Sequence, residues 1–198
     1  MATVGCNTWG DSAMSDANIE RERNTDMVSF RLEPSVRRAL GALASEAGFE
    51  VNSYMQRLLR LHAITWTDKD TANAHQILPT AERDLIFWSQ WLIDAAVRTA
   101  REMDAAGEFT AHFTLAVIRA LFQDPEFVAN YAKVEGSEAR ESGVSAKSAL
   151  NMALGFHIKS AVGAEAETDG APPKGKPKRV QVRGEAIQSY TLLRKPYS

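Results

Sequence analysis

The chain has 198 residues and a net charge of −2, and hydrophobic residues make up 44% of it, as in ordinary soluble globular proteins with one or two domains. No apolar stretch reaches the ~18 residues of a membrane-spanning helix, and the N-terminus lacks the pattern of a signal peptide. The single cysteine, Cys6, excludes an intrachain disulfide. We therefore expect a cytoplasmic protein without a membrane partner.

Charge is distributed unevenly along the chain. Residues 27–62 carry a net charge of +2 and residues 163–198 a net charge of +3, whereas residues 1–26 and 63–162 are net acidic. Affinity for DNA depends on local basic surface rather than on total charge. The acidic total therefore does not exclude DNA as a partner.

The N-terminal part begins with a polar stretch, residues 1–25, that shows no periodicity and is expected to be a disordered arm. The following segment, residues 27–33, alternates: Val28, Phe30 and Leu32 fall on one face, and polar residues fall on the other. Such alternation predicts a half-buried strand, which Pro34 ends.

Two amphipathic helices are predicted next, over residues 35–47 and 51–63. Gly48 stands where a glycine often terminates a helix, and Asn52 and Ser53 stand where capping residues begin one. The apolar faces of these helices include Leu40, Tyr54 and Leu58. Residues 26–64 therefore form a predicted strand–helix–helix unit.

The remaining chain is predicted to contain a linker over 65–78, a helical domain over 79–162 and a flexible basic tail over 163–198. The helical domain begins with a long helix, about 80–105, that is apolar nearly all the way round and should be buried on more than one side or in an oligomer interface. Further helices are predicted at about 110–123, 125–134 and 144–162. The tail contains two β-like pieces, RVQVR and SYTLL, and its bases could form a nucleic-acid arm or a solubilising linker: Lys174, Lys176, Lys178 and Arg179.

One strand and two helices within about forty residues cannot close a hydrophobic core. If two copies pair their strands antiparallel, each supplies the other's missing edge, and the apolar faces pack against four helices. We therefore expect a mostly α protein whose N-terminal unit is an intertwined homodimer. The predicted dimer core consists of Val28, Phe30, Leu32, Leu40, Tyr54 and Leu58.

The order of strand, helix, Gly48 and a Val51-Asn52-Ser53 helix start resembles the ribbon-helix-helix family of DNA-binding proteins, the Arc and MetJ type, over about residues 26–63. The resemblance implies a two-stranded ribbon that reads the major groove of double-stranded DNA. Met27, Ser29 and Arg31 would be the base-reading residues, and Arg31 is the best candidate because Arg to guanine is the commonest specific contact. Asn52 and Ser53 would bind a phosphate through their backbone N–H groups.

These features predict a sequence-specific dimeric DNA-binding protein, most simply a transcriptional repressor that could form higher oligomers on DNA. A first alternative is an accessory protein of plasmid transfer (a relaxosome component) or an antitoxin, with a protein partner bound through residues 78–198. A second is an enzyme with a site in the helical domain, for which Asp84, Asp94 and Asp104 are the only hint. The residues His62, His75, His112 and His157 show no metal-type spacing, and no nucleotide-binding or catalytic motif is present, so we expect no cofactor, no metal and no enzymatic activity.

Overall fold

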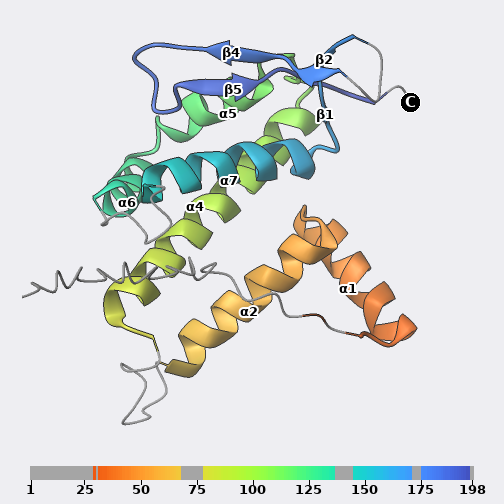
Figure 1. Ribbon diagram of the computed structural model, residues 1–198, viewed down its shortest axis with the longest axis vertical. Helices are drawn as coiled ribbons and strands as arrows, with labels where there is room; N and C mark the ends of the chain where they lie inside the picture. The colour runs from red at the N-terminus through yellow and green to blue at the C-terminus, as the bar shows by residue number, and fades with distance from the viewer. Residues whose placement is uncertain (1–28, 30, 68–77, 137–144, 171–174, 197–198) are drawn as a thin grey trace, which may run out of the picture.

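The computed structural model describes residues 29, 31–67, 78–136, 145–170 and 175–196, and the described part begins with a helical hairpin (Figure 1). Helix α1 (Pro34–Ala47) and helix α2 (Val51–Thr67) are joined by a turn. Pro34 occupies the first turn of α1, where a missing N–H costs nothing, and Gly48 ends α1 in the left-handed conformation with φ of 80°. Both predicted helices are confirmed, and α2 is longer than expected.

Four further helices, one of them central, build the main body. Helix α4 (Thr80–Ala105) packs against α5 (Phe113–Leu121), α6 (Pro125–Glu135) and α7 (Ala146–Ala161). The Asp124 carboxylate accepts a hydrogen bond from the Glu126 N–H, and Pro125 follows it, so a side-chain cap and a proline together start α6. These four helices are confirmed, and α4 is buried on more than one side as its all-round apolarity predicts.

The C-terminal part forms short antiparallel strand pairs that lie beside α5 and α7 (Figure 1). Backbone hydrogen bonds join three separate segments at one point: the Glu167 N–H donates to the Leu192 carbonyl, and the Lys178 N–H to the Glu167 carbonyl, each at 2.8 Å. The pairs are β1 (Glu165–Ala166) with β6 (Leu193–Arg194), β2 (Thr168–Asp169) with β3 (Lys176–Pro177), and β4 (Arg179–Gln181) with β5 (Ser189–Thr191).

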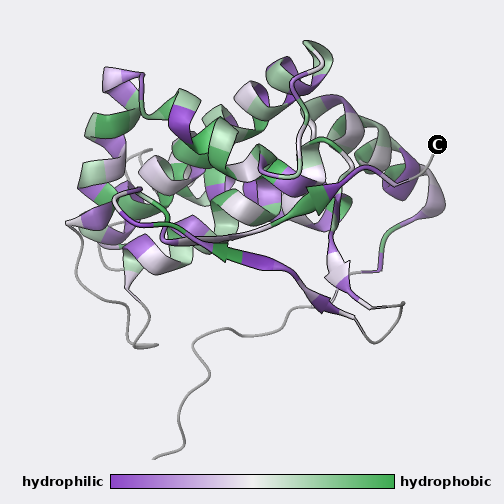
Figure 2. Cartoon of the chain, turned by 90° about the horizontal axis from the view of Figure 1, so that it is seen from above, coloured by the Kyte–Doolittle hydropathy of each residue, from purple (hydrophilic) through white to green (hydrophobic). Residues whose placement is uncertain are grey.

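The hydrophobic core is shared by the helices and these strands. Helices and strands alternate between apolar and polar stripes (Figure 2), and the apolar stripes of α4 to α7 meet in the core. Ile187, Tyr190 and Leu193 from the C-terminal segment are buried in the same core, and the Tyr190 hydroxyl lies 2.6 Å from Nδ1 of His112. Burying an apolar side chain of this size contributes about 1.5–3 kcal/mol, which holds the strands on the helices.

The expected fold class is therefore wrong in two respects. The described chain does not begin with a strand of a ribbon-helix-helix unit: residues 29 and 31–33 are in no strand, helices come first, and the strands lie at the C-terminus. The reason is that a strand needs a hydrogen-bonded neighbour, and no described strand runs beside residues 31–33. Met27, Val28 and Phe30 lie outside the described residues.

The second correction concerns the expected flexible tail. This segment is part of the folded body, because its strands β1 to β6 pair with one another and it contributes buried side chains to the core. Its Pro, Gly and charged residues are typical of linkers, but the short β-like pieces between them carry enough apolar surface to dock on α5 and α7.

Candidate functional site

The predicted DNA-contacting residues form two groups, one before the start of α1 and one after its end. Ser29 and Arg31 are exposed just before the helix, whereas Asn52, which is exposed, and Ser53, which is half-buried, begin α2 after the turn. A helix of 14 residues spans about 21 Å. Within one chain the structure therefore does not bring the predicted base-reading and phosphate-binding residues together.

The turn between α1 and α2 is packed against the main body. The Phe49 ring meets the His157 ring of α7 edge-on at 5.4 Å between centroids, and Arg101 of α4 donates a hydrogen bond to the Glu46 carbonyl at 2.6 Å. Glu50 lies beside α7, where the Ser160 hydroxyl is 3.5 Å from its carboxylate. The Glu50 carboxylate therefore lies directly before the start of α2, which disfavours a phosphate there.

An ion pair fixes α2 on α4. Nε and Nη2 of Arg57 donate to the two carboxylate oxygens of Asp94 at 2.9 and 2.7 Å, and Nε2 of Gln90 donates to the same carboxylate at 2.8 Å. The hydrogen bond that Arg57 donates to Asp94 raises the pKa of Arg57 above its usual value. By sequence, Arg57 is one of the bases of this region. In the structure the Asp94 carboxylate of α4 neutralises its charge.

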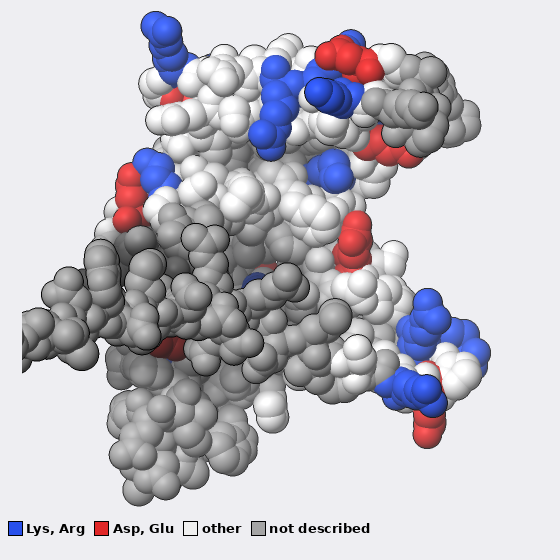
Figure 3. Space-filling view, viewed as in Figure 1, with Lys and Arg blue, Asp and Glu red and all other residues white. Residues whose placement is uncertain are grey.

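The arginines at the start of α1 are arranged differently. Arg31, Arg37 and Arg38 are exposed, and the nearby carboxylate is that of Glu33. Figure 3 shows Lys and Arg side chains gathered at the end of the molecule where α1 begins. In the part of the chain that the structure describes, this end therefore carries exposed positive charge.

An apolar surface runs along α1 and α2 beside these arginines. The members of the predicted dimer core that the structure describes are only partly covered: Leu40 and Tyr54 are half-buried, and Leu32 and Leu58 are exposed. Ala44 and Ile64 are the buried apolar residues of the hairpin among those described. The large apolar side chains exposed on the described part of the hairpin, which we call the hairpin surface, are Leu32, Val36, Leu43, Leu58 and Leu59.

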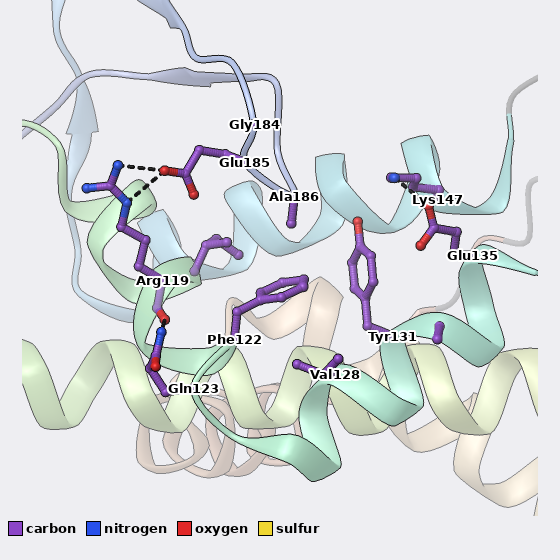
Figure 4. A pocket seen from close by; sticks show the side chains of 12 residues that line it. Arg119, Phe122, Gln123, Val128, Tyr131, Glu135, Lys147, Gly184, Glu185 and Ala186 are labelled. Carbon is purple, nitrogen blue, oxygen red and sulfur yellow. Dashed lines mark hydrogen bonds and ion pairs between the residues drawn. The ribbon is translucent and has the colours of Figure 1, made fainter.

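A first groove, of about 550 Å³, lies between α5, α6 and the turn after β4 (Figure 4). Its charges are paired: Arg119 donates to Glu185 at 2.6 Å, and Lys147 pairs with Glu135. Burial raises the pKa of Tyr131 above its usual value. Each charged side chain that lines this groove is therefore paired with a charge of the opposite sign.

A second groove, of about 740 Å³, lies between α7 and the β4–β5 pair, and we call it the α7–β groove. Three cationic side chains, those of Lys147, Lys159 and Arg179, line it together with Met152 and Phe156. The sequence indicated the basic residues of the tail but not this groove, because its two walls are distant in the chain. The spacing of Met152 and Phe156, four residues apart on one helix, is the signal that could have indicated one wall.

The remaining predicted candidates do not gather into a site. Asp94 is paired with Arg57, Asp104 is 2.8 Å from Nζ of Lys195, and Asp84 lies 4.0 Å from Arg83, so the three aspartates have separate partners and line neither groove. Within the described residues there is no group of three or more His, Cys, Asp or Glu side chains that could hold a metal ion.

None of the described helices combines the length and the apolarity that crossing a membrane requires. No protein-family model, no curated protein and no solved structure matches the chain.

Proposed function

We propose that this protein is a homodimeric DNA-binding protein that acts as a transcriptional regulator, with its DNA-contacting surface at the start of α1. The observation that carries the proposal is the exposed group of Arg31, Arg37 and Arg38. Arginine is the residue most suited to bidentate contacts with phosphate and with guanine, and neutralising phosphates supplies most of the sequence-independent affinity for DNA.

A second copy of the chain is the proposed cover of the hairpin surface. Two helices of 14 and 17 residues with so few buried apolar residues gain little from burial on their own, and an exposed apolar patch of this kind is typical of an interface. Dimerisation through this surface would place the arginines of two chains on one assembly and double the basic surface offered to DNA. The base-reading role of Ser29 and Arg31 remains part of this proposal.

The experiment selects bound sites from random duplex DNA with the full chain and then measures binding to the selected site. Arg31→Ala should cost about 1–3 kcal/mol and relax specificity at one base position. Arg37→Ala and Arg38→Ala should weaken binding to all sequences and each lower the slope of log K against log salt by about 0.9. Arg183→Ala removes an exposed arginine from the β4–β5 turn, away from α1, and serves as the matched control. Equal binding by all four variants would contradict the proposal.

The dimer is tested separately by sedimentation. Leu58 and Val128 are aliphatic side chains with the same exposed fraction, 39%, on α2 and α6. Leu58→Glu should yield a monomer and lose affinity for the selected site, whereas Val128→Glu should leave the dimer intact. A wild-type chain that stays monomeric at tens of micromolar would contradict the assignment of the hairpin surface.

A further inference from the structure

The α7–β groove combines features that the duplex-binding proposal does not use. Its charged lining residues are Lys147, Lys159 and Arg179, and no Asp or Glu side chain is among its described lining residues. Lys147 pairs with Glu135 at the edge of the groove, but Lys159 and Arg179 form no ion pair within the described chain. The groove is therefore a local site of uncompensated positive charge in a chain of net negative charge.

Apolar and aromatic surface lies between these charges. Met152 and Phe156 lie four residues apart on α7, so they occupy one face of the helix, and they are 62% and 42% exposed. Nζ of Lys159 lies 5.7 Å from the centroid of the Phe156 ring. An exposed ring beside a cation offers a stacking surface for a planar group that also carries negative charge.

The groove walls also supply hydrogen-bonding side chains. Ser148 of α7 and Gln188, Ser189 and Thr191 of the β5 segment line the groove, and their hydroxyl and amide groups can donate or accept hydrogen bonds. On the face seen in Figure 3, Lys and Arg side chains lie over β4, β5 and α7. Positive charge, an exposed ring and polar side chains thus line one concave strip between a helix and a β-hairpin.

From this combination we propose that the α7–β groove binds a single strand of nucleic acid. A single strand presents unpaired base faces that stack on aromatic rings, and phosphates at regular intervals that neutralise Lys and Arg. A duplex offers the phosphates but keeps its bases stacked on one another, so it would leave Phe156 and Met152 uncovered. An acidic peptide would pair with the cations but would leave the Phe156 ring uncovered. A nucleotide can stack its base on this ring and place its phosphate beside Lys159.

This inference goes beyond the proposed function and does not rest on it, because the groove and the start of α1 share no residue. The two proposals can therefore fail independently. Arg37→Ala and Arg38→Ala should leave single-strand binding unchanged, and Arg179→Gln should leave binding to the selected duplex unchanged.

The test measures the fluorescence anisotropy of labelled 20-nucleotide oligothymidylate and oligouridylate with the full chain at low salt. Phe156→Ala should weaken binding at least about fivefold, and Phe156→Trp should restore it, since either ring can stack. Lys159→Gln and Arg179→Gln should each reduce the salt slope by about 0.7, the value for one phosphate contact with a single strand. The relative affinities for the two oligonucleotides distinguish DNA from RNA as the strand that is bound.

The matched control is Lys176→Gln, which removes one exposed cation from β3 of the same β structure without touching the groove. Its binding and salt slope should remain as in the wild type, and circular dichroism should show the same helix content for every variant. Absence of oligonucleotide binding, an equal loss for Lys176→Gln and Arg179→Gln, or an unaffected Phe156→Ala variant would overturn the proposal. Tighter binding of a labelled polyglutamate than of either oligonucleotide would assign the groove to acidic peptides and would also overturn it.

Discussion

The attachment of α2 to α4 can be tested by a double-mutant cycle on Arg57 and Asp94. The two side chains are 26% and 31% exposed and are joined by a bidentate contact. Exposed ion pairs couple by about 0.2–1 kcal/mol, and breaking a fully buried pair costs about 3–5 kcal/mol. Because this pair is about three-quarters covered and has two charge-assisted hydrogen bonds, we expect a coupling free energy of about 1.5–2 kcal/mol.

Each single variant should lower the free energy of unfolding by removing contacts of its own. Arg57→Ala also removes the stem that packs beneath the charge and a guanidinium 5.9 Å from the Phe49 ring, so it should lower the free energy of unfolding by about 2–3 kcal/mol. Asp94→Ala should leave Arg57 without its carboxylate and Gln90 without its acceptor. The double variant should be less destabilised than the sum of the two, and the difference is the coupling.

The assay is urea denaturation followed by circular dichroism. The slope of each transition is compared as well, because equal slopes show that the variants unfold to a similar state. Arg119 and Glu185 form the matched control cycle, because they make a similar contact in which the arginine side chain is 60% exposed and water screens the charges. The control pair should couple more weakly than Arg57 and Asp94. Equal coupling in the two cycles, or a value below about 0.5 kcal/mol for Arg57 and Asp94, would refute the argument from burial.

Three further predictions concern the free energy of unfolding, and each rests on the surroundings of one residue. Gly48→Ala should cost about 1–3 kcal/mol more than Gly107→Ala: both glycines have φ close to 80°, but a Cβ at Gly48 would lie 2.8–2.9 Å from side chains of α4, and one at Gly107 would meet nothing. Burial, followed by the charge of Arg60, lowers the pKa of His157 below its usual 6.5, so the stability of the wild type should be complete above pH 6.5 and should fall as the pH drops from 6.5 toward the lowered folded-state pKa. Asp124→Ala should cost about 1 kcal/mol, since it removes the side-chain cap of α6. Urea denaturation measures all three, repeated between pH 7.5 and 5 for the second.

Each of these outcomes has a contradicting result. Equal costs at the two glycines would show that the neighbours of Gly48 move aside. For the pH effect, His157→Phe keeps an aromatic ring beside Phe49 and should flatten the fall in stability; a fall as steep as that of the wild type would assign the effect to another group. An Asp124→Ala variant as stable as the wild type would mean that Pro125 alone suffices to start α6.

Local sequence signals determined where the helices begin and end. Gly48, Pro79 with Thr80, and Asp124 with Pro125 stand at or next to helix ends, and the apolar periodicity between such residues predicted each described helix. These predictions succeeded because helix hydrogen bonds join residues four apart, so the information is contained in a short window. The all-round apolarity of residues 85–97 likewise predicted that α4 is buried on more than one side, since such a helix has no face suited to water.

Only the tertiary structure decided which distant residues meet. Arg57 is an ordinary surface charge by sequence, and its partner Asp94 lies 37 residues away. The C-terminal strands are two or three residues long, and each is stabilised by pairing and burial rather than by its own pattern, which is why a linker-like composition concealed them. Strand pairing, ion pairs and grooves join chain segments at any separation, so their partners are set by how the helices pack and not by the neighbouring residues.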